Sequence, residues 1–148
     1  MGLMDRPDIL EILHKLGIRF IRSYHLHKED FLHWKLSTMP FEIQPFWYEP
    51  QGFPDILEFP LQGYIDCVWK DIHGYDKTEE YLNLVKTEID YIVEKNLSWS
   101  YAQHDWSSIK GDPKMIITKT IIEYALKKGV NIISYLDYYK KMAKNKRH

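Results

Sequence analysis

Apolar positions in the first part of the chain change from a helical to an extended spacing. Isoleucines and leucines recur at helical intervals between Ile9 and Leu16, behind Pro7, which suits the first turn of a helix. Gly17 is expected to end this helix. The segment Ile18–Tyr24 is rich in β-branched and aromatic residues, which predicts a strand.

The middle of the chain lacks a clear period. Between His25 and Pro54, aromatic residues are interleaved with prolines. This pattern indicates a long excursion with short extended pieces. A structureless loop of that length in a compact domain is usually functional or wrongly assigned. Two extended pieces are predicted after it, over Ile56–Leu61 and, following Gly63, over Tyr64–Trp69.

The C-terminal part alternates helical and extended patterns. Helical spacing predicts three helices, over 77–96, from Pro113 to Gly129, and over 135–144 behind Ser134 as a cap. Strands are predicted over 97–103 and 130–134, with a loop over 104–112. Such alternation is typical of a parallel α/β sheet or barrel, in which functional side chains follow the carboxyl ends of strands.

Composition excludes several classes of protein. The chain has 148 residues with a net charge of −1, so it is expected to form one domain at most and lacks the basic excess of a dedicated nucleic-acid binder. No apolar run reaches the roughly eighteen residues of a membrane span, and no signal peptide is recognisable, so the cytoplasm is the default expectation for its location. Cys67 is the only cysteine, which excludes an intramolecular disulfide, and it is interpreted as a buried strand residue.

Several stretches resemble polysaccharide deacetylases, the NodB-homology enzymes of carbohydrate esterase family four. The run Gln103–Asp112, the helix that ends at Gly129 and the segment Val130–Tyr135 resemble the C-terminal end of that family. Residues 5–20 resemble the helix and strand after its third motif, and Ile56–Trp69 resembles the strand that carries its fourth motif. The resemblance implies that residues 1–148 form the C-terminal part of a NodB-type domain, a partial (β/α) barrel with the first strands missing.

The resemblance also implies what this chain lacks. Family members begin with a Thr-Phe-Asp-Asp-Gly-like motif and continue with a His-Ser-x-x-His-like motif and an Arg-x-Pro motif, none of which occurs here. No residue is therefore assigned to the catalytic metal, and the zinc-like divalent ion of the complete family domain is not expected to bind this chain alone. We expect the chain to be inactive by itself, with a matching N-terminal half or a second copy as partner. The acetylated substrate is left open between chitin-like, peptidoglycan-like and smaller amides.

Four residues are candidates for the site that hydrolyses an N-acetyl group on a carbohydrate. By resemblance His104 is the general acid, a role that suits the ordinary pKa of about 6.5 of histidine. Asp66 resembles the carboxylate that holds and charges this histidine. Trp69 and Trp106 are candidates for the wall of the substrate pocket, although the family tryptophan often directly follows the aspartate. The structural alternatives are a histidine bonded to loop backbone, a solvated carboxylate and core tryptophans.

Other groups have simpler interpretations. His25 and His27, with His33 nearby, could ligate one metal ion if they share a face of a strand, but polar loop histidines are common and the resemblance gives them no metal role. Trp34 and the run Phe46–Tyr48 could stack on sugars, although cover for the core is the simpler interpretation. The alternative function is a non-catalytic carbohydrate- or partner-binding module that keeps only the aromatic face.

Overall fold

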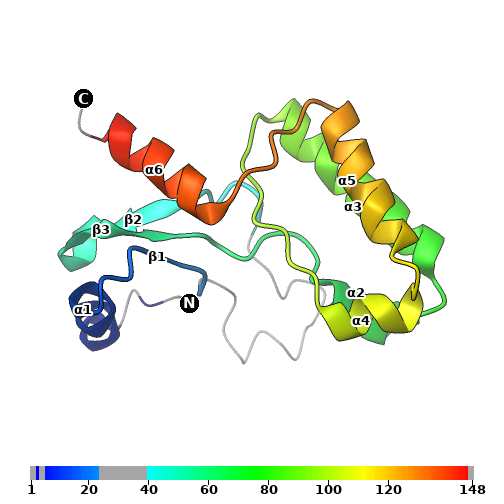
Figure 1. Cartoon of the computed structure of the whole chain (residues 1–148), viewed down its shortest axis with the longest axis horizontal. Coiled ribbons are helices and arrows are strands. Elements are labelled where there is room, and N and C mark those ends of the chain that lie inside the picture. The colour runs from blue at the N-terminus through cyan, green and yellow to red at the C-terminus, as the bar shows by residue number, and fades with distance from the viewer. Residues whose placement is uncertain (1–2, 4–5, 24–39, 147–148) are drawn as a thin grey trace.

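A computed structural model describes residue 3 and the ranges 6–23 and 40–146 (Figure 1). The described part is a mixed α/β fold with a small sheet at one end and a group of helices at the other. The C-terminal helix lies beside the sheet, and long non-helical segments connect the two ends.

The three-stranded sheet has β3 (Phe53–Glu58) in its centre. Strand β1 (Phe20–Ile21) pairs with it in parallel, and β2 (Phe46–Tyr48) pairs with it antiparallel across the short 3-10 helix η3 (Glu49–Gln51). The strands predicted within 18–24 and 56–61 are thus confirmed in part. Strand β2 lies in the stretch that was expected to be a long excursion with short extended pieces.

The first helix, α1 (Pro7–Lys15), is confirmed and covers the sheet. Its inward side chain Leu10 is fully buried with Tyr48 and Ile56, and these three residues form a small core. Each such side chain contributes about 1.5–3 kcal/mol when it leaves water.

The segment Tyr64–Trp69 is not a strand, contrary to the prediction. Its second half opens helix α2 (Asp66–His73), which buries Val68 and Trp69. Gly63, at φ 68°, turns the chain into this helix where a Cβ would lie 2.9 Å from the Phe41 ring. The apolar run was too short to distinguish a buried strand from a buried helix turn. Cys67 therefore lies on a helix and is half-buried, which corrects its interpretation as a buried strand residue.

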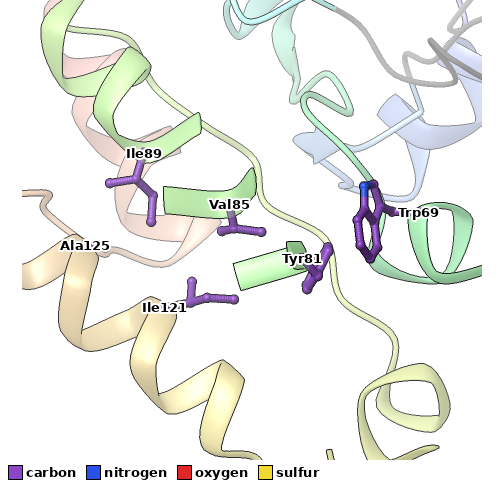
Figure 2. Packing of buried hydrophobic residues seen from close by; sticks show 6 residues of the cluster. All are labelled: Trp69, Tyr81, Val85, Ile89, Ile121 and Ala125. Carbon is purple, nitrogen blue, oxygen red and sulfur yellow. The ribbon is translucent and has the colours of Figure 1, made fainter. Parts of the chain in front are cut away.

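The larger core lies between two helices that run side by side in the same direction, α3 (Thr78–Glu94) and α5 (Ile116–Lys127), which confirm two predicted helices. Figure 2 shows three side chains of α3 facing α5, with the α2 tryptophan beside Tyr81. The buried members of this cluster are Trp69, Tyr81, Val85, Ile89, Ile121 and Ala125. The 3.6-residue spacing of the α3 stripe places these apolar side chains on one face.

The segments 97–103 and 130–134, predicted as strands, run as non-helical chain outside any ladder of the described residues. Side-chain amides take the place of a neighbouring strand for the first of them. Gln44 accepts from the Ser98 N–H at 2.8 Å and donates to the Ser98 carbonyl at 3.0 Å, and Gln62 accepts from the Ser100 N–H at 3.0 Å. Backbone groups of a buried extended segment need such partners.

The region predicted as a loop over 104–112 contains helix α4 (Asp105–Gly111), so that expectation is wrong. The last helix, α6 (Tyr135–Asn145), is confirmed together with its cap, because the Asp137 N–H donates to the Ser134 hydroxyl. The ring of Phe59, just after β3, lies 4.5 Å from the ring of Tyr135 and 5.4 Å from that of Tyr138, centroid to centroid.

An apolar groove of about 750 Å³ lies among α3, α5, α6 and the two non-helical segments. Its lining includes Trp99, Ile122, Ile132, Ile133 and Tyr138. In the described part of the chain, no helix is long and apolar enough to cross a membrane.

Candidate functional site

The structure brings Asp66 and His104 together although they are 38 positions apart. Asp66 is the first residue of α2 and is fully buried, while His104 directly precedes α4. The imidazole Nδ1 lies 2.9 Å from Asp66 Oδ1, and the backbone N–H of His104 donates to the same oxygen at 3.0 Å. A carboxylate can only accept, so Nδ1 carries the hydrogen and Nε2 is left for other chemistry. The His104 side chain is 43% exposed, so the ring can be reached from solvent.

The backbone of His104 is held from its other side by the first turn of α4. The Ser108 hydroxyl donates to the His104 carbonyl at 2.7 Å, and the Gln103 amide hydrogen-bonds to the Ser108 hydroxyl. Gln103 also donates to Thr118 on α5 at 2.6 Å. The histidine is therefore fixed in position by α2, α4 and α5 together.

A buried lysine adds a positive charge behind the pair. Lys70 lies one turn after Asp66 on α2, and its Nζ is 3.8 Å from Asp66 Oδ2 and 3.2 Å from the Ser107 carbonyl to which it donates. It also lies over the Tyr81 ring, 5.1 Å from the centroid. Burial lowers the pKa of Lys70, and the charge of Asp66 opposes that shift.

Two tyrosines continue the hydrogen-bonded network of Gln103. The hydroxyls of Tyr81 and Tyr101 are 3.0 Å apart, and Tyr101 donates to Gln103 at 3.1 Å. Burial is the main cause that raises the pKa of Tyr101 to about 12, so this phenol stays protonated at neutral pH. The network is a hydrogen-bonded support and supplies no charge.

Cys67 stands next to Asp66 and close to the imidazole. One ligand atom each from Asp66, Cys67 and His104 lies within 4.8 Å of the other two, a spacing that suits a metal ion. Burial, followed by the negative charges of Asp66 and Asp71, raises the pKa of the Cys67 thiol. The thiol is thus protonated at neutral pH when no cation is nearby.

The two candidate tryptophans occupy different environments. Trp106 is 52% exposed, and its ring centroid is 5.7 Å from that of His104, so it presents an accessible aromatic ring beside the histidine. Trp69 is 7% exposed and packs against Tyr81 and His73 in the larger core. Contact of either residue with a substrate stays a prediction.

The other residues singled out from the sequence do not join this site. His25, His27, His33 and Trp34 lie outside the described residues. Within the run Phe46–Tyr48, Tyr48 is fully buried and donates to Glu58, and Trp47 packs on Tyr139. These contacts are those of core cover.

Sequence reasoning missed Lys70 as a neighbour of Asp66 and Cys67 as a neighbour of His104. The i,i+4 spacing of Asp66 and Lys70 is a helical pairing signal, but it has no meaning once the segment is interpreted as a strand. No local pattern links Cys67 with a residue 37 positions later.

The site thus consists of a buried carboxylate that orients a half-exposed histidine. This arrangement is typical of acid–base groups. No family model, curated protein or solved structure matches this chain.

Proposed function

We propose that this chain is the C-terminal part of a polysaccharide deacetylase-like domain in which His104 acts as general acid. The reaction is metal-dependent hydrolysis of an N-acetyl group on a carbohydrate. Asp66 is the positioning residue that holds the imidazole and stabilises its charged form. The observation that supports this proposal is the 2.9 Å contact between His104 Nδ1 and the fully buried Asp66 carboxylate.

Hydrolysis of the N-acetyl amide requires that a proton be delivered to the departing amine. With Nδ1–H donated to Asp66, the doubly protonated ring can release a proton from Nε2, and the carboxylate compensates the positive charge before that step. Trp106, with its ring beside the imidazole, is proposed to form part of the wall against which the acetylated sugar lies. Trp69 is proposed to support the pocket from the core side.

The metal ion of the complete domain would polarise the acetyl carbonyl and lower the pKa of a bound water. The described residues offer no set of ligands for that ion apart from the proposed acid. The ligand-spaced group found among them, Asp66, Cys67 and His104, contains the proposed acid itself. A nitrogen that binds metal cannot also deliver a proton, so no step of the proposed reaction is assigned to a metal held by this group.

The apolar groove supports the proposal of a partner. Ile132 and Ile133 line it and are 55% and 41% exposed, and the neighbouring segments 97–103 and 130–134 have no ladder partner among the described residues. Exposed apolar surface of this kind is typical of an interaction site. We propose that an N-terminal half carrying the family metal motifs, or a second copy, covers it. A carbohydrate- or partner-binding module without catalysis is the alternative.

The proposed function is tested by restoring the missing motifs. The chain is fused to, or co-expressed with, a deacetylase N-terminal half, and acetate release from an N-acetylated chito-oligosaccharide is measured. We expect His104→Ala to lower kcat by roughly 10² to 10⁴-fold, because a positioned proton donor is lost. Asp66→Asn should lower it less, and Trp106→Ala should mainly raise KM. Trp69→Ala should mainly destabilise the folded chain, by about 3–5 kcal/mol, because Trp69 is buried in the larger core.

His14→Ala is the matched control, because His14 also pairs with an aspartate, Asp55, through Nδ1 at 3.1 Å but on the surface. Activity should not change in that variant. If His104→Ala kept full activity while His25→Ala or His27→Ala abolished it, the general acid would lie in the 25–33 stretch and the proposal would be wrong.

A further inference from the structure

We propose that Asp66, Cys67 and His104 form a binding site for one borderline-soft divalent metal ion such as Zn²⁺. The site is separate from the catalytic metal of the resembled family. It shares His104 with the deacetylase proposal, so a metal ion bound here and proton donation by His104 exclude each other. The ion is inferred only from the donors that this chain holds together.

The three donor atoms lie close enough together for one ion to stand between them. A carboxylate oxygen, the Cys67 Sγ and an imidazole nitrogen lie within 4.8 Å of one another. Zinc bonds of 2.0–2.3 Å in a tetrahedron place the ligand atoms about 3.6 Å apart. Asp66 and Cys67 are consecutive on the first turn of α2, and His104 is held beside them by its backbone hydrogen bond to Asp66. The fourth position is left for water or an external ligand.

The donor set selects the ion. A thiolate, an imidazole and one carboxylate suit Zn²⁺ and Co²⁺, whereas Mg²⁺ and Ca²⁺ require mostly oxygen ligands. Cys67 would lose its thiol proton to the solvent when the metal–sulfur bond forms, as zinc-bound cysteines do. No oxidant or other reactant is needed.

A second observation points to a missing ligand at this place. Asp66 is fully buried, yet its Oδ2 has no hydrogen-bond partner among the described residues, and Lys70 Nζ approaches it only to 3.8 Å. A buried carboxylate oxygen without a hydrogen bond is costly, and a bound cation removes that cost. Oδ1 meanwhile keeps its bond to the His104 backbone.

The surrounding charges balance a divalent ion. Asp66, the Cys67 thiolate and the nearby Asp71 carry three negative charges, and Lys70 carries one positive charge, which leaves two negative charges with a neutral imidazole. Lys70 is directed to the Ser107 carbonyl and the Tyr81 ring, so its ammonium has partners besides Asp66. Charge neutrality matters because Asp66 and Lys70 are both buried.

The test is titration of the purified full chain with Co²⁺ alone as a spectroscopic substitute for Zn²⁺. We expect one equivalent to produce a thiolate-to-cobalt charge-transfer absorption, which Zn²⁺ then displaces. Cys67→Ser should abolish this absorption, because the band requires sulfur. His104→Gln should weaken Co²⁺ binding at least about tenfold, the lower end of what even the loss of a supporting partner costs at metal sites.

His14→Gln is the matched control and should leave Co²⁺ binding unchanged, since the surface His14–Asp55 pair has the same contact without a cysteine. Both test positions are partly exposed, so the variants are expected to fold, and their circular-dichroism melts verify this. Absence of the charge-transfer band in the wild-type chain, or its persistence at full strength in His104→Gln, would overturn the proposal.

Discussion

The Asp66 carboxylate receives two hydrogen bonds from one residue, and both reach the same oxygen. Because the backbone N–H and the ring N–H of His104 converge on Oδ1, the ring orientation is set by the same contact that sets the chain position. Such a double anchor specifies which ring nitrogen carries the proton in the neutral state.

We therefore expect neutral His104 to be protonated mainly at Nδ1. Nitrogen-15 NMR of the imidazole at alkaline pH measures this tautomer directly. In Asp66→Asn the Nδ1–H population should fall, because a neutral amide oxygen accepts more weakly than a carboxylate. His14, which has its own aspartate partner, should keep its tautomer in this variant. A wild-type His104 protonated mainly at Nε2 would contradict the described contact.

Glu88 on α3 is a second residue whose surroundings strongly change its properties, here the pKa of its carboxyl group. Its side chain is buried, Oε1 accepts from the Tyr64 N–H at 3.1 Å, and Oε2 has no hydrogen-bond partner in the described part of the chain. Burial raises the pKa of Glu88 from 4.5 to about 7. Between these two values the folded chain binds more protons than the unfolded chain, so Glu88 makes the free energy of unfolding fall as pH rises.

We expect Glu88→Gln to remove this dependence and to be more stable than wild type at pH 8, by on the order of 3 kcal/mol. Urea unfolding at pH 5 and pH 8 measures the difference. Glu94→Gln, at the exposed end of the same helix, is the control and should change neither value appreciably. Equal wild-type and Glu88→Gln stability curves over this pH range would show that the carboxyl is not desolvated.

At the scale of elements, the helices follow local signals closely. The stripe of α3 and the cap of α6 are both visible in short windows of sequence, because helix periodicity and capping depend on neighbours a few residues away. The first turn of α2 shows the limit of such signals. Its apolar residues Val68 and Trp69 suit a strand equally well, and packing decides for the helix.

The Ser134 cap offers a direct test at this scale. Its hydroxyl accepts from the Asp137 N–H at 3.1 Å and donates to the Asp137 carboxylate at 2.7 Å. Ser134→Ala should lower the free energy of unfolding by about 1 kcal/mol, and Ser134→Gly by only a few tenths, as is usual for N-caps. Urea denaturation distinguishes the two variants. A cost for glycine equal to that for alanine would mean that the hydroxyl contacts do not carry the effect.

At the scale of the whole molecule, the open groove among α3, α5 and α6 is the dominant feature. Apolar side chains from three helices and two extended segments line it, and several of them, such as Ile122, Ile132 and Ile133, are exposed to solvent. Surfaces of this extent promote association when no partner covers them.

We expect the isolated chain to self-associate, with a concentration-dependent mass in light scattering. Ile132→Glu places a charge in the groove and should reduce association, whereas Ile72→Glu, equally exposed at 51% on α2 but outside the groove, should not. A monomer at all concentrations with a cooperative melt would count against both the groove as an interface and the half-domain proposal.

The helices α1, α3, α5 and α6 and the approximate places of β1 and β3 could be predicted from sequence, because their patterns are local and extend over several residues. The helical state of α2, the helix after His104 and the amide pairing of Ser98 and Ser100 could not. Each depends on groups brought from elsewhere in the chain.

The candidate site shows the same division. His104 and Asp66 were proposed as a pair by resemblance. The approach of Cys67 and Lys70 could not be predicted, because it required the turn at Gly63 and the packing of α2 against α4. Side chains up to 38 positions apart come together only when the core packs. Burial of apolar surface, and not local conformational preference, offsets the chain entropy that such long-range contacts cost.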